Sequence, residues 1–62
     1  MAIVKITTTY DEILEINTNQ TDINPAKLDN VELIYAVAKW AKEQNKHNRF
    51  FSIKAIEILY RF

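Results

Sequence analysis

The sequence predicts an α+β fold in which an antiparallel β-hairpin, one amphipathic helix and a C-terminal strand follow in the order ββαβ. Three observations favour this order. Residues 2–9 and 13–18 alternate apolar and polar side chains, as strands do, and residues 31–41 repeat apolar side chains at steps of three and four. Residues 50–62 are rich in β-branched and aromatic side chains. The chain has 62 residues, so we expect a single domain, residues 1–62.

The first two segments are expected to pair as an antiparallel hairpin, because each presents one face to a core and the other to water. The core-facing side chains are expected to be Val4, Ile6 and Thr8 in the first strand and Leu14 and Ile16 in the second. The residues between the two strands, 9–12, form a compact polar connection.

The chain contains no glycine, the residue that adopts positive φ most easily. Asp and Asn tolerate the left-handed region best among the other residues, so Asp11 is expected to carry positive φ at the hairpin turn. Asn17 or Asn19 is expected to carry a second. An asparagine within residues 45–48 is expected to end the helix in place of the usual glycine.

The helix is the most clearly marked element of the sequence. Pro25 suits the first position of a helical turn, and Asp29 followed by Glu32 is a capping-box arrangement that satisfies free amides at a helix start. The apolar stripe that follows consists of Leu33, Ile34, Val37, Ala38, Trp40 and Ala41.

The last segment is compatible with two structures. As a strand, it would place Phe51, Ile53 and Ala55 on one face and then shift its apolar phase, which requires a β-bulge or two buried faces. As a helix, it would be capped by Ser52 and give a ββαα fold. We favour the strand, because its isoleucines and aromatic residues suit a pleated surface and a third strand completes the sheet.

The composition argues against an enzyme. Without glycine, phosphate-binding loops and strained nucleophile turns are excluded, and without cysteine so are thiolate nucleophiles, disulfides and the usual zinc sites. His47 has no partner in the sequence pattern, and Asp11, Glu12 and Glu15 are expected to form a solvated hairpin tip. We therefore expect no catalytic, cofactor-binding or metal-binding residues and no cofactor.

Two surfaces are candidates for binding a macromolecule. Aromatic residues dominate binding hot spots, and the candidates for a protein interface are Tyr35, Trp40, Phe50, Tyr60 and Phe62. Trp40 could instead seal the core against the sheet. The candidates for a basic patch that binds nucleic acid are Lys39, Lys42, Lys46 and Arg49. The net charge of the chain is zero, which favours the protein interface over the nucleic-acid site.

A domain of this size buries only about 60% of the surface of its unfolded chain, so a protein partner or a homodimer is expected to add stability. No apolar run reaches the ~18 residues of a membrane span, and no signal sequence precedes the first strand. We expect a cytoplasmic protein that does not bind membranes.

The order of elements resembles that of short phage-encoded accessory proteins with a ββαβ plan, which act in host takeover or against host defence. The resemblance is carried by the alternating residues 3–8, the helix from Asp29 through Trp40, and residues 51–57. It implies a non-enzymatic protein that binds a host polymerase, nuclease, toxin or defence protein as an inhibitor or modulator. The balanced charge departs from the strongly acidic DNA mimics among such proteins.

Overall fold

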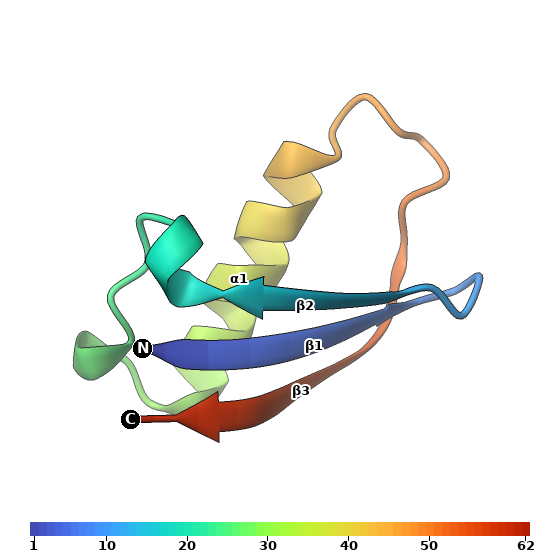
Figure 1. Ribbon diagram of the computed structural model, residues 1–62. Helices are drawn as coiled ribbons and strands as arrows, with labels where there is room; N and C mark the ends of the chain where they lie inside the picture. The colour runs from blue at the N-terminus through green and yellow to red at the C-terminus, as the bar shows by residue number, and fades with distance from the viewer.

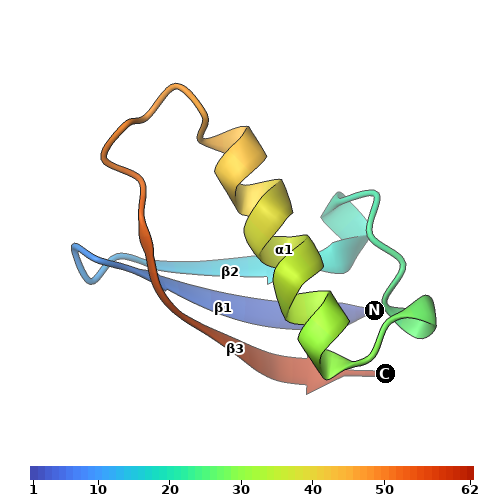
Figure 2. The ribbon, with the colours of Figure 1, turned by 180° about the vertical axis from the view of Figure 1, so that it is seen from behind.

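A computed structural model describes all 62 residues and confirms the ββαβ order (Figure 1). A three-stranded antiparallel sheet in the order β2-β1-β3 carries the helix on one face and leaves the other face uncovered (Figures 1 and 2). The strands are β1 (Ala2–Thr8), β2 (Ile13–Asn17) and β3 (Ile53–Arg61), and the helix is α1 (Asn30–Gln44). Short 3₁₀ turns, η1 (Thr18–Gln20) and η2 (Pro25–Lys27), lie between β2 and α1.

The core lies between the sheet and α1. Strand β1 is central and contributes every second residue to it, as the alternating sequence predicts. The buried apolar residues are Ala2, Val4, Ile6, Ile16, Leu33, Val37 and Ala41. Seven side chains make a small core, as expected for a chain of this length.

Asp11 is the only residue with positive φ, at 61°, which confirms its predicted role in the hairpin turn. The turn is closed by the Asp11 amide donating to the Thr8 carbonyl at 3.0 Å. The prediction of a second such residue at Asn17 or Asn19 is wrong. Asn17 has an ordinary φ of −91°, and its side chain accepts a hydrogen bond from the Asn19 amide, which turns the chain without left-handed backbone.

Both ends of α1 are capped by side chains. The predicted capping box is present: Asp29 accepts from the Glu32 amide at 2.8 Å, and Glu32 accepts from the Asp29 amide at 3.0 Å. At the other end, Asn45 has a φ of −114°, so the expected left-handed cap is absent. Asn45 instead donates twice to the Ala41 carbonyl, from its side-chain amide at 2.8 Å and from its backbone amide at 3.1 Å.

The last segment is a strand, and the helical alternative with a Ser52 cap is wrong. Its register against β1 shifts twice, so the sequence's change of apolar phase is accommodated by bulges, as the strand interpretation required. Ile56 and Ile58 pair with Ile6 and Val4, which face the helix. Ala55 pairs with Thr7 on the open face, so its predicted place beside Ile53 is wrong.

Candidate protein interface

The outer edge of β2 offers unpaired backbone groups. The Thr8 amide donates to the Glu12 carbonyl at 2.9 Å, so even-numbered residues of the hairpin bond across it. Hydrogen-bonded and non-bonded pairs alternate along an antiparallel ladder, which makes Leu14 a residue that bonds to β1. Ile13 and Glu15 therefore direct their amides and carbonyls away from β1. No strand lies beyond them.

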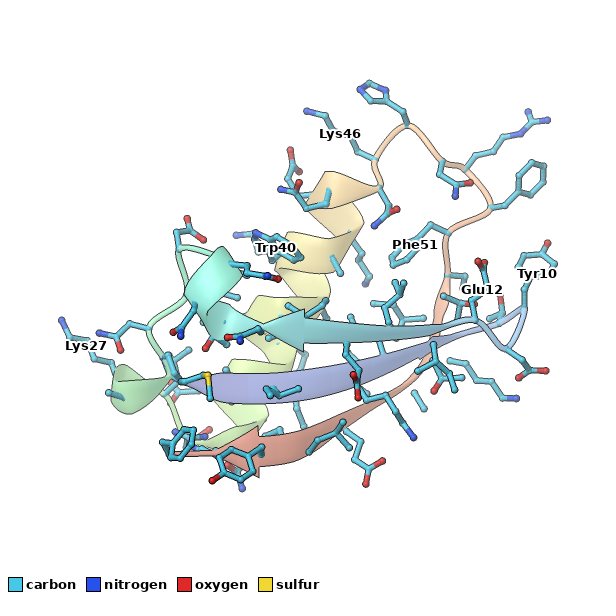
Figure 3. All side chains as sticks on the ribbon, in the orientation of Figure 1. Tyr10, Glu12, Lys27, Trp40, Lys46 and Phe51 are labelled. Atoms are coloured by element: carbon cyan, nitrogen blue, oxygen red, sulfur yellow. The ribbon has the colours of Figure 1, made fainter.

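The helix leaves part of β2 uncovered. It crosses the sheet diagonally, and its first turns lie by the C-terminal end of β3 (Figure 2). Ile16 of β2 is buried, whereas Leu14, on the same helix-facing side, is 37% exposed. Trp40 and Phe51 are half-buried and pack against the core, and in the view of Figure 3 both rings lie beyond the free edge of β2. Leu14 thus leaves apolar surface exposed beside the unpaired backbone of β2.

Trp40 also lines an open pocket of about 400 Å³ between α1 and the segment that follows η1. Ile23 and Ala36 complete its apolar lining, and Asp22, Lys39 and Glu43 supply its charged lining. Of the two predicted roles, Trp40 fulfils the structural one through its core contacts, and its remaining exposed surface stays available to a partner.

A row of charged side chains crosses the open face of the sheet. Lys5 of β1 lies opposite Glu15 of β2 on one side and Glu57 of β3 on the other. Its amine is 3.6 Å from the Glu57 carboxylate, whereas Glu15 forms no ion pair. The row ends at the β2 edge in an exposed carboxylate without a partner.

The predicted aromatic candidates do not form one surface. Tyr60 and Phe62 contact each other edge to face, with ring centroids 4.4 Å apart, and are exposed near the two chain termini. Phe50 lies in the loop after α1, at the opposite end of β3 (Figure 1). Tyr35 is exposed on the helix. The structure brings together only Tyr60 and Phe62, whereas Tyr35, Trp40 and Phe50 occupy separate elements or faces.

The basic candidates gather loosely at the end of α1. Lys39 and Lys42 are exposed on the helix, and Lys46 lies just beyond it, 3.3 Å from the carboxylate of Glu43. Arg49 lies in the next loop, where its guanidinium stacks over the Phe50 ring at 5.0 Å. Neighbouring acidic and aromatic side chains thus engage two of the four cations.

The residues considered for catalysis remain dispersed. His47 is exposed in the loop, and no cluster of three or more acidic or histidine side chains is placed to hold a metal ion. Asp11 forms a salt bridge of 3.0 Å with Lys54 of β3, which ties the hairpin tip to the neighbouring strand. The sequence did not single out Ile13, Leu14 and Glu15 as an edge, because strand order decides which strand is outermost.

Arg61 also has a role that the sequence did not predict. Its guanidinium donates to the Asn30 side chain and to the Pro25 carbonyl, both at 2.8 Å, and to the Leu28 carbonyl. These bonds fasten the end of β3 to the connection before α1. Arg61 is therefore a structural clamp and takes no part in the basic patch.

No protein-family model, curated protein sequence or solved structure matches this chain. The one α-helix, α1, lacks the length and apolar character needed to cross a membrane. The assignment of function therefore depends on the surfaces described above.

Proposed function

We propose that the protein is a small non-enzymatic binding module that captures an extended segment of another protein at the free edge of β2. One observation supports this most strongly. The backbone groups of Ile13 and Glu15 at this edge have no hydrogen-bond partner, and the apolar side chain of Leu14 between them is partly exposed. Strand addition gives affinity through main-chain hydrogen bonds and specificity through alternate side chains.

The other edge of the sheet is less suited to this role. Strand β3 carries two register shifts against β1, and bulges twist an edge away from regular pairing. Strand β2 pairs with β1 without a shift over five consecutive residue pairs. Proteins commonly protect edges with bulges and charges. Strand β2 has no bulge and one charged residue, Glu15, beside the exposed Ile13 and Leu14, so its edge is the better suited to pairing.

The resemblance to phage accessory proteins adds a proposal about the partner. The partner would be a host enzyme or defence protein. Binding at the β2 edge would block or reshape a segment that the partner needs for its own activity. The half-buried Trp40 beside the pocket offers an anchor for a side chain that follows the captured segment.

A peptide-display selection against the full chain tests the proposal without knowledge of the host. We expect enrichment of sequences that favour an extended backbone, and their synthetic peptides should bind the folded protein. These sequences should lack Pro at every second position, where the peptide amide must donate to the β2 edge. Failure to enrich any binding peptide would overturn the proposal. Retention on a DNA matrix above physiological salt, lost in the Lys42→Glu, Lys46→Glu double variant, would instead assign a nucleic-acid site.

A further inference from the structure

We propose that the segment captured by β2 comes from a different protein and alternates basic and apolar side chains, with a Lys or Arg opposite Glu15. This inference depends on the proposed strand capture and specifies the chemistry of its partner. It follows from the charges on the two faces of the β2 edge.

On the open face of the sheet, the residue of the captured strand that pairs with Glu15 should be a cation. Carboxylate and ammonium groups already alternate across the sheet from Glu57 to Lys5 to Glu15, and Glu15 ends the row without a partner. A residue paired directly with Glu15 in an added strand points to the same face, with its Cβ about 5 Å away. Opposite charges at such positions stabilise strand pairing, and like charges oppose it.

The helix-facing side requires apolar residues at the alternate positions. Leu14 faces this side and is 37% exposed, and the next residue on the same face, Ile16, is buried under the helix. Neighbours of the cation in an added strand point to this side, because side chains alternate along a strand. They would cover Leu14 and lie on the side of Trp40 and Phe51 (Figure 3).

A second copy of this chain is a poor occupant of the same edge. In such a dimer, the two β2 strands would pair antiparallel about a twofold axis, with both helices on the same face of the joined sheet. Glu12 and Glu15 of both copies would then lie along the new interface. Strand β2 and the residues directly flanking it contain no lysine or arginine that could compensate. Like charges across a strand pair are destabilising, so the charge pattern selects a heterologous basic segment over self-association.

The probe is the capped heptapeptide Val-Lys-Val-Arg-Val-Lys-Val, and its control has Glu at each basic position. Titration into isotopically labelled full-length protein locates binding by amide chemical shifts. We expect the basic peptide to shift the amides of residues 12–17 and the acidic peptide to bind roughly tenfold more weakly or not at all.

Charge reversal provides the matched comparison. Glu15→Lys is expected to weaken the basic peptide roughly tenfold and to strengthen the acidic one, because the charge at the pairing position is inverted. Ala26→Lys combined with Val31→Lys makes the same change in net charge at two exposed positions outside the row of charged side chains, in η2 and the first turn of α1. This double variant is expected to leave both affinities within about twofold, because exposed charges far from the β2 edge are screened by salt.

The outcomes separate the two proposals. Equal effects of Glu15→Lys and of the Ala26→Lys, Val31→Lys double variant would overturn the basic-strand inference and leave strand capture at β2 standing. Peptide-induced shifts confined to residues outside β2 would overturn both proposals. Protection of β2 amides that grows with protein concentration in the absence of peptide would overturn it in favour of a second copy. If neither this peptide nor any displayed peptide bound, strand capture itself would be wrong.

Discussion

Replacement of Thr18 by Val is expected to destabilise the fold through a single lost hydrogen bond. The Thr18 side chain is 2% exposed, and its hydroxyl accepts the Ala2 amide at 2.9 Å. The last residue pair between β1 and β2 at this end is Ile3 with Asn17, and this bond joins the next two residues, Ala2 and Thr18. Val has nearly the shape of Thr, so the change removes the acceptor without opening a large cavity.

The magnitude follows from the burial of the Ala2 amide. A buried donor left without an acceptor costs about 1–3 kcal/mol. A domain of 62 residues has a free energy of unfolding of roughly 3–9 kcal/mol, so a loss of about 2 kcal/mol is a large share. At about 4–8 °C per kcal/mol for a domain of this size, Tm should fall by about 8–16 °C.

Urea unfolding followed by circular dichroism measures this loss as a lower midpoint at unchanged slope. Thr18→Ser retains the hydroxyl and is expected to lose only about 1 kcal/mol, for the missing methyl group. Amide hydrogen exchange at Ala2 should accelerate in the Val variant and remain slow in the Ser variant. A Val variant within about 0.5 kcal/mol of the parent, with Ala2 still protected, would refute the reasoning.

Two further changes test the caps and the turn. Asp29→Ala removes the acceptor for the Glu32 amide and should lower the free energy of unfolding by about 1 kcal/mol, whereas Asp29→Asn should lose much less; equal losses in urea unfolding would contradict this. Asp11→Ala should be about 1 kcal/mol less stable than Asp11→Gly. Both lose the Lys54 salt bridge, so their difference isolates the positive φ, and equal midpoints would show that the turn tolerates alanine.

Much of the fold could be predicted because local patterns and tertiary packing agree. Alternation in β1, the Asp29 capping box and the phase shift in β3 each have one physical explanation, and the structure contains all of them. The prediction of extra left-handed residues failed because Asn17 and Asn45 cap the chain through side-chain hydrogen bonds, which make positive φ unnecessary.

The candidate interface was harder to predict because it depends on the arrangement of elements. Sequence composition identifies exposed aromatic residues, but it does not reveal that Tyr60 and Phe62 meet while Phe50 lies at the far end of β3. The edge position of β2 follows from β3 pairing with β1 on its other side, and the exposure of Leu14 follows from where the helix crosses. Both are long-range properties that a local pattern does not contain.

Amide hydrogen exchange of β2 tests strand capture most directly. In the free protein the outward amides of Ile13 and Glu15 should exchange quickly, while the amides of Leu14 and Ile16, which bond to β1, exchange slowly. With the basic heptapeptide bound, strand addition predicts that Ile13 and Glu15 become slow as well. Fast exchange of both amides in a saturated complex would contradict capture at this edge.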